Sequence, residues 1–379
     1  MTATASRGES VVDSGTRAPF AASERGAAMY TPPMTSHMKQ ALLAFACLAL
    51  ATTPSAHAQS PDCIPSNGLN FICGLHKPED LVLVPGTSWL IASGMDPGAG
   101  LHLIDTGAKR AQPLYATDTP VRPDRNRFAS CPEPLDPRQA ILHGLSLRPA
   151  QAGHYTLYAT NHGGRESIEV FDIDGRGATP SAAWVGCVLM PDKLAANSVA
   201  AFGDGALVST VVSLPGKTSP DGRNTGAVFM WTPGESVFHR LDGTELPVNN
   251  GIETSADGPE FFVVSMGLRQ IVAFSRADPS KPIGFAQLTG FTPDNVRMVG
   301  TRLVAAGMAV ADPSCVGGTP CPRGFAAQAI DPKTLVVSDL ARFPATPPYS
   351  GTATAIPIDG EIWLSSYNGD RVAYGPIPR

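Results

Sequence analysis

The amino-acid sequence predicts an all-β fold, and within that class a six-bladed β-propeller, from three observations. Gly (38) and Pro (36) together make up about a fifth of the 379 residues, whereas an average protein has about 12%. Six times, an apolar run meets a turn rich in Gly, Pro or Asp and returns as a second apolar run. These hairpins recur at a loose interval of about 50 residues, which is typical of propellers.

Each predicted hairpin supplies the first two strands of one blade. Four hairpins are followed by a further apolar run, such as 168–173 or 270–274, which predicts a third strand. Helical periodicity is not sustained anywhere after residue 58. A pair of β-sandwiches is the alternative, but it would not produce six similar hairpins. In chain order the predicted hairpins cover residues 81–92, 141–160, 198–211, 251–265, 296–306 and 352–365.

The N-terminal part of the chain has the pattern of a leader. Lys39 is followed by an apolar run, 41–51, and then by Ala56-His57-Ala58, a small-x-small cleavage signal. The apolar run is too short to span a bilayer, which takes roughly 20 residues. We therefore predict that residues 1–58 are an N-terminal extension and signal peptide that is removed. Residues 59–379 are expected to form a single propeller domain that is periplasmic or secreted, with Met1 and Met38 both open as translation starts.

The number of cysteines is consistent with export. Six remain after the leader, and an even number in an oxidising compartment predicts disulfides. Six cysteines allow 15 pairings, and proximity in the sequence favours Cys63–Cys73 and Cys315–Cys321, which leaves Cys131–Cys187. A zinc site is disfavoured because no CxxC pair is present.

Composition also limits the partners. The formal net charge is −5 and no basic run occurs, which argues against nucleic-acid binding. No other apolar stretch is long enough to cross a bilayer, so no membrane span is expected. The oligomeric state stays open.

Polar residues lie at the start of each predicted first strand and therefore recur with the hairpins. The first strands of a propeller line the central channel, so these residues should converge at one rim, where unsatisfied polar groups are costly. Carboxylates and amide oxygens are the ligands that Ca²⁺ prefers. Asn and Asp also occur there as ordinary turn formers, but five in register favour an ion. The residues are Glu79, His143, Asn197, Asn250 and Asp294, with Asn295 adjacent and Thr352 in the sixth hairpin.

Two histidines form a second candidate site. His143 opens one predicted strand and His162 closes its hairpin partner, so the two imidazoles should share a rim. A histidine pair near neutral pH can relay a proton and activate water. Each of the two could instead be a structural histidine.

Three stretches carry a resemblance to a known family: Pro78–Pro85, His143–Ser146 together with Asn161–Phe171, and Asn250–Gly258. On these the chain resembles the paraoxonase/arylesterase family, calcium-dependent lactonases related to regucalcin/gluconolactonase propellers. The resemblance implies that Glu79, Asn197, Asn250, Asp294 and Asn295 bind a catalytic calcium and that His143 and His162 are a catalytic dyad.

The same resemblance implies a second, structural calcium at Asp80 and the Leu145 carbonyl. Its third ligand would be an acid, where this chain has Ser198, so the match to the second ion is incomplete. The family's disulfide between the two ends of the propeller has no counterpart, because no Cys follows Cys321. Strand pairing or local disulfides must therefore close the ring.

The resulting hypothesis is an exported calcium-dependent hydrolase of lactones and/or aryl esters. The metal would polarise the carbonyl and the histidine dyad would activate water, so no serine nucleophile is needed, and no G-x-S-x-G occurs. One alternative is a non-catalytic calcium-binding propeller that recognises a protein or a sugar. Another is a quinone-dependent sugar dehydrogenase. Lactones, aryl esters and phosphotriesters are all open as preferred substrates.

Overall fold

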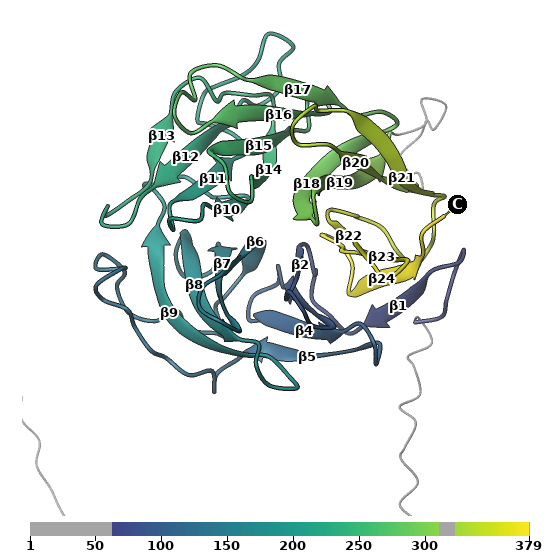
Figure 1. The fold of residues 1–379 in the computed structure, drawn as a ribbon, viewed down its shortest axis with the longest axis horizontal. Helices are drawn as coiled ribbons and strands as arrows, with labels where there is room; N and C mark the ends of the chain where they lie inside the picture. Colours follow the sequence, from purple (N-terminus) through teal and green to yellow (C-terminus); the bar gives the residue numbers. More distant parts are fainter. Residues whose placement is uncertain (1–62, 311–322, 379) are drawn as a thin grey trace, which may run out of the picture. The chain divides into compact units, whose positions relative to one another are not determined.

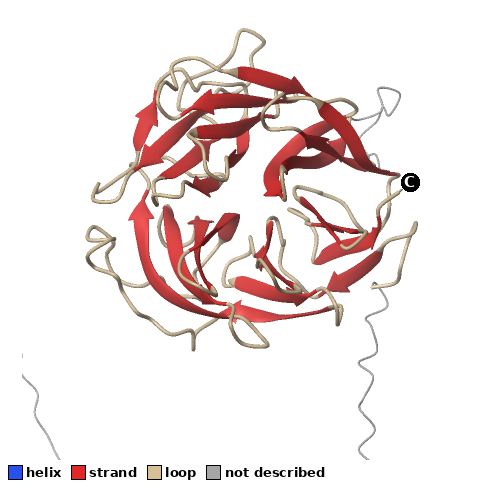
Figure 2. Cartoon of the chain, in the orientation of Figure 1, coloured by secondary structure: helices blue, strands red, loops and turns tan. Residues whose placement is uncertain are grey.

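The computed structural model describes residues 63–310 and 323–378. The predicted leader, with Cys47, lies outside the described residues, as do Cys315 and Cys321. Within the described ranges the chain forms strands and loops and no helix, so none there could cross a membrane (Figure 2).

The strands form six antiparallel sheets of four, arranged as the blades of a propeller (Figure 1). Blade 1 contains β2 (Leu81–Leu83), β3 (Trp89–Ser93), β4 (Leu101–Asp105) and β5 (Arg110–Tyr115). Blade 2 contains β6 (Leu142–Pro149), β7 (His154–Asn161), β8 (Ser167–Asp174) and β9 (Ser181–Leu189). Blade 3 contains β10 (Val199–Ala201), β11 (Leu207–Val211), β12 (Ala227–Trp231) and β13 (His239–Leu241).

Blade 4 contains β14 (Asn249–Thr254), β15 (Glu260–Ser265), β16 (Gln270–Ser275) and β17 (Gly284–Gln287). Blade 5 contains β18 (Phe291–Val299), β19 (Arg302–Ala309), β20 (Phe325–Ile330) and β21 (Val337–Phe343). Blade 6 contains β22 (Ala355–Ile358), β23 (Glu361–Leu364), β24 (Arg371–Pro376) and, as its outermost strand, β1 (Asn70–Cys73). The predicted six-bladed propeller is confirmed, and each predicted hairpin forms the first two strands of one blade.

Pairing between the two ends of the chain closes the ring. β1 lies antiparallel to β24, with Asn70 opposite Tyr374 and Cys73 opposite Arg371. The Cys63–Cys73 disulfide anchors this N-terminal strand to the segment before it. Closure therefore comes from strand pairing, one of the two means expected from the sequence, and the local disulfide braces the N-terminal strand.

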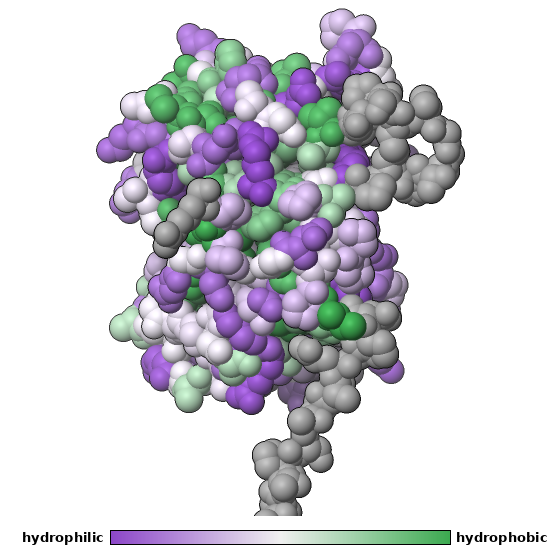
Figure 3. Space-filling model, turned by 90° about the vertical axis from the view of Figure 1, so that its right-hand side faces the viewer, coloured by the Kyte–Doolittle hydropathy of each residue, from purple (hydrophilic) through white to green (hydrophobic). Residues whose placement is uncertain are grey.

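Apolar side chains pack between neighbouring blades. One buried cluster joins Val208 and Val228 of blade 3 to Phe261, Val263 and Phe274 of blade 4. Such burial stabilises a structure by roughly 25 cal/mol for each Å² of apolar surface removed from water. On the side drawn in Figure 3, polar side chains dominate the exterior and apolar ones are interspersed among them. The blades thus bury their apolar faces against each other and expose their outer edges.

The segment between β5 and β6 runs along the outer strand of blade 2. Arg122 N–H donates to the Trp184 carbonyl and Asp124 N–H to the Val185 carbonyl, both at 2.8 Å. The Cys131–Cys187 disulfide fastens the segment to β9. Cys63–Cys73 is thus one of the two pairings that proximity favoured, and Cys131–Cys187 is the pairing that they left. Farther along, the segment approaches the turn after β7, where a Cβ atom on Gly163 would lie 1.7 Å from the Gln139 carbonyl oxygen.

Candidate active site

Irregular strand pairing brings the predicted site residues to one end of the central channel. The register of the first strand against the second shifts between Leu142 and Leu145, between Asn249 and Ile252, and between Pro293 and Val296. His143, Asn250 and the Asp294-Asn295 pair lie within these three shifts. A β-bulge takes residues out of the regular ladder and redirects their side chains. Glu79 and Asn197 precede their strands as expected, whereas His143, Asn250, Asp294 and Asn295 lie inside theirs.

Two glycines next to site residues allow the innermost strands of neighbouring blades to approach closely. A Cβ atom on Gly144 would lie 2.6 Å from Ser198 Cα and 2.8 Å from the Asn197 carbonyl oxygen. One on Gly251 would lie 2.6 Å from Asn295 Cα. Such distances are shorter than any van der Waals contact, so a side chain at either position would push two blades apart. The His143-Gly144 and Asn250-Gly251 pairs thus set the spacing of the site.

Glu79 is the central carboxylate of the group. Its side chain is 2% exposed, its Oε1 accepts a hydrogen bond of 2.7 Å from Asn295 Nδ2, and its Oε2 lies 3.5 Å from His143 Nε2. Asn295 Nδ2 also donates to Thr354 Oγ1 at 3.1 Å. Asn295 therefore presents its amide nitrogen, rather than its oxygen, to Glu79, and holds that carboxylate in place.

Three buried oxygens of the predicted calcium site have no hydrogen-bond partner among the described residues: Glu79 Oε2, Asn197 Oδ1 and Asn250 Oδ1. The Asn250 amide nitrogen is engaged instead with Met266 Sδ, at 2.9 Å. Each unsatisfied buried polar atom costs about 1–3 kcal/mol. A hard cation would satisfy all three at once, and such donors are its preferred ligands.

The Asp294 carboxylate shows why a cation would be stable at this site. Burial, and then the charge of Glu79, raise the pKa of Asp294 to about 7, while His143 and a hydrogen bond from Asn250 act in the opposite direction. Burial also disfavours the charged form of His143, but Glu79, Asp294 and Glu166 outweigh it and raise the pKa of this imidazole. Two carboxylates thus face each other in a poorly solvated space.

The donor set fits a calcium ion and not a softer metal. The available carboxylate and amide oxygens belong to Glu79, Asn197, Asn250 and Asp294. Asn295 would become a ligand if its side-chain amide rotated by about 180° and exchanged its oxygen and nitrogen. The described ranges contain no group of three or more His, Cys, Asp and Glu side chains placed to hold a metal. A metal site at this position would depend on asparagine side chains. Such ligands are compatible with Ca²⁺ and unusual for zinc or iron.

The two predicted histidines are in contact. His143 Nδ1 and His162 Nε2 lie 3.1 Å apart, and the ring planes are inclined by 59°. His162 Nδ1 is in turn 2.9 Å from Glu166 Oε2. Glu166 was not among the residues predicted from the sequence, although its position four residues after His162, inside the stretch that carries the family resemblance, was an available signal.

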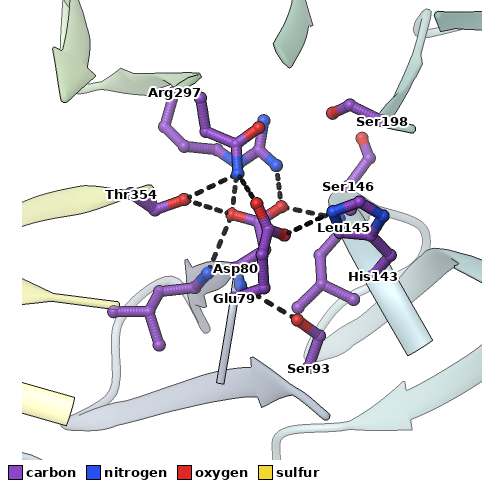
Figure 4. Close-up of polar contacts among 12 residues, drawn as sticks. Glu79, Asp80, Ser93, His143, Leu145, Ser146, Ser198, Arg297 and Thr354 are labelled. Carbon is purple, nitrogen blue, oxygen red and sulfur yellow. Dashed lines mark hydrogen bonds and ion pairs between the residues drawn. The ribbon is translucent and has the colours of Figure 1, made fainter. Parts of the chain in front are cut away.

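Asp80, matched by the resemblance to a second calcium, has its oxygens occupied (Figure 4). Its Oδ2 accepts the Leu145 N–H at 2.7 Å and forms an ion pair with Arg297, and its Oδ1 accepts from Thr354 Oγ1 at 2.7 Å. Burial lowers the pKa of Arg297 to about 10, so its guanidinium stays charged at neutral pH. Leu145 thus contributes its N–H toward Asp80. The residues present do not fit a second calcium ion, because a guanidinium already neutralises Asp80.

Comparisons with known proteins found similar solved structures but no similar sequence. No family model and no curated protein matches the sequence. The solved structures that are similar include a candidate gluconolactonase (14% identity, TM-score 0.48, covering 83% of this chain and 94% of that chain). A luciferin-regenerating enzyme is also similar, with 12% identity and a TM-score of 0.48 over 81% of this chain and 95% of that chain. The calcium-binding protein regucalcin from Agrobacterium tumefaciens has 12% identity and a TM-score of 0.46 over 81% of this chain and 91% of that chain. At these identities and TM-scores the likeness assigns no reaction to this chain.

Proposed function

We propose that this protein is a calcium-dependent hydrolase of lactones and/or aryl esters. One observation carries the proposal. Among the described residues, one buried oxygen each of Glu79, Asn197 and Asn250 lacks a hydrogen-bond partner, and these oxygens belong to a site in which His143 Nε2 lies 3.5 Å from Glu79 Oε2. This arrangement combines a place for a hard cation with a base beside it. Neither element alone would favour a hydrolase over a calcium-binding propeller.

The calcium site would consist of Glu79, Asn197, Asn250 and Asp294, with Asn295 as a further ligand. The bound ion would act as a Lewis acid toward a carbonyl oxygen and stabilise the negative charge that forms on it. Two carboxylates would balance the charge of a divalent cation. Substrate and water would complete the six to eight ligands that calcium takes.

His143 would act as the general base. Its Nε2 accepts a proton from a water molecule while the water oxygen bonds to the carbonyl carbon, and the π electrons of the carbonyl move to its oxygen. When this tetrahedral species collapses, the bond to the alkoxy or aryloxy oxygen breaks. The His143 imidazolium returns the proton to that oxygen. A lactone gives a hydroxy acid, and an aryl ester gives a carboxylic acid and a phenol.

Features outside the site support export. The Cys63–Cys73 and Cys131–Cys187 disulfides are compatible with an oxidising compartment. The predicted leader of residues 1–58 points to the same compartment. We therefore propose a periplasmic or secreted location.

A substrate panel tests the proposal. The protein, purified after expression of the full chain, is offered γ- and δ-lactones, phenyl acetate and a phosphotriester, first with calcium and then with a chelator. Hydrolysis that stops on chelation and returns with calcium supports the proposal, and the panel ranks the substrate classes. A folded protein that binds calcium and hydrolyses nothing would contradict it and favour a binding propeller instead.

A further inference from the structure

We infer that Glu166 is a positioning residue of the proposed hydrolytic site and that it sets the tautomers of both histidines. The inference deepens the proposed function and depends on it. It rests on a continuous chain of contacts: Glu166 Oε2 to His162 Nδ1 at 2.9 Å, His162 Nε2 to His143 Nδ1 at 3.1 Å, and His143 Nε2 facing Glu79 at 3.5 Å.

The direction of each hydrogen bond follows from the carboxylate. An ionised carboxylate only accepts, so His162 Nδ1 must carry the hydrogen that it receives. In a neutral His162 the other nitrogen, Nε2, is then an acceptor. His143 Nδ1 must therefore be the donor in the contact between the rings, which leaves His143 Nε2 without a hydrogen once a cation, and not His143, balances the charge of Glu79. The nitrogen on the side of the calcium ligands is thus the basic one.

Removing the carboxylate would remove this constraint. His162 could then hold its proton on Nε2, where it would point at His143 Nδ1. His143 would respond by placing its own hydrogen on Nε2, and the nitrogen on the side of the proposed calcium ligands would no longer be a base. The role is that of the third member of a catalytic triad, which holds a histidine in the correct tautomer and orientation.

The loop that carries Glu166 is held in a fixed conformation by its own residues. Asn161 Nδ2 donates to the carbonyls of Gly163 and Arg165 at 2.9 and 2.8 Å. Arg165 forms two hydrogen bonds, of 2.8 and 2.9 Å, to Glu169, whose side chain is fully buried. These bonds fold residues 161–167 so that His162 and Glu166 meet. The contact is therefore built into the loop.

The same blade provides a matched control. His154 Nδ1 lies 3.1 Å from Asp172 Oδ1, and the Asp172 side chain is 34% exposed, compared with 35% for Glu166. His154 begins β7 whereas His162 follows its end, so the control pair lies at the opposite end of the strand. Asp172→Asn removes a histidine–carboxylate contact of similar exposure and leaves the contacts among Glu166, His162 and His143 unaltered.

The experiment compares Glu166→Gln, Glu166→Ala and Asp172→Asn with the unaltered protein, using the best substrate of the panel. Loss of a carboxylate that orients a metal-binding histidine costs about 10- to 100-fold, and we take the same range for Glu166. We expect both Glu166 variants to lose about this factor in kcat, with KM and calcium affinity unchanged. ¹⁵N chemical shifts of His162 should change from an Nδ1–H tautomer to a mixture. Asp172→Asn should change none of these quantities.

Two outcomes separate the two claims. If the unaltered protein hydrolyses the substrate and both Glu166 variants retain its kcat, Glu166 has no positioning role, while the proposed function stands. If the unaltered protein hydrolyses nothing, the proposed function fails. The ¹⁵N spectra then still decide whether Glu166 fixes the His162 tautomer, and an unchanged spectrum would overturn the inference on its own.

Discussion

Glu79 and His143 face each other from neighbouring blades, with 3.5 Å between the Glu79 Oε2 and His143 Nε2 atoms, although they are far apart in the sequence. The carboxylate is buried and its Oε2 has no hydrogen-bond partner among the described residues. A proposed ligand oxygen for calcium and a candidate base are thus adjacent. This adjacency is the basis of the predictions that follow.

Glu79→Gln should weaken calcium binding by about two orders of magnitude, because the charge of the ligands determines the affinity of calcium sites. The substitution keeps the shape of the side chain and removes its charge. Calorimetric titration measures the change. Glu260→Gln, at the partly buried start of β15, is the control and should bind calcium like the unaltered protein. Equal affinities for both variants would exclude Glu79 as a ligand.

His143→Gln should lower turnover by about 10²- to 10⁴-fold, the range that general bases contribute. Calcium should still bind, since His143 is not among the proposed ligands. Steady-state kinetics and a calcium titration of the same sample separate the two effects. Full activity in this variant would remove His143 from the mechanism.

Calcium affinity should fall as the pH drops through 7. The pKa of Asp294 is raised to about 7, so below that pH the calcium-free protein holds a proton that the metal must displace. Each unit below the pKa should cost up to about tenfold in apparent affinity. Titrations at pH 8 and pH 6 measure this difference. Asp294→Asn should bind more weakly and lose the pH dependence; an unaltered pH dependence in that variant would contradict the assignment.

Chelation should abolish hydrolysis and leave the propeller folded, because the Arg297 guanidinium, and not a metal, neutralises Asp80. Cooperative thermal unfolding should persist in the presence of the chelator when followed by circular dichroism. Unfolding of the protein at room temperature on chelation would show instead that an ion holds the ring together.

Arg297→Met should destabilise the protein by about 3–5 kcal/mol, because it leaves the Asp80 carboxylate buried without its counter-ion. Urea unfolding measures this change. The control is Arg276→Met, which breaks the more exposed ion pair with Asp204 and should cost no more than about 1 kcal/mol. Similar losses in the two variants would show that the Asp80–Arg297 pair has no special structural importance.

The sequence predicted the propeller because each hairpin is a local signal: the apolar strands and their turn lie within about 20 residues. It also predicted which residues gather at the channel, since strand starts are equivalent from blade to blade. The bulges at His143, Asn250 and Asp294 were not predictable in this way. A bulge is a property of the pairing between two strands, so the sequence of one strand alone does not indicate it.

The contacts that the sequence did not reveal are of two kinds. Asp80 and Arg297 are 217 residues apart and meet only because the ring closes. Glu166 is close to His162 in the chain, but it lies in a loop that the other blades do not repeat, so comparison among the hairpins could not find it. Repetition identified the proposed calcium ligands and was uninformative about everything specific to one blade.

The most direct test measures hydrolysis and calcium binding side by side during one calcium titration of the chelator-treated protein. We predict that activity on the best substrate rises with the same midpoint as binding and saturates when one calcium ion is bound per chain. Activity that persists before calcium is added, or that stays absent after the site is filled, would contradict a calcium-dependent hydrolase.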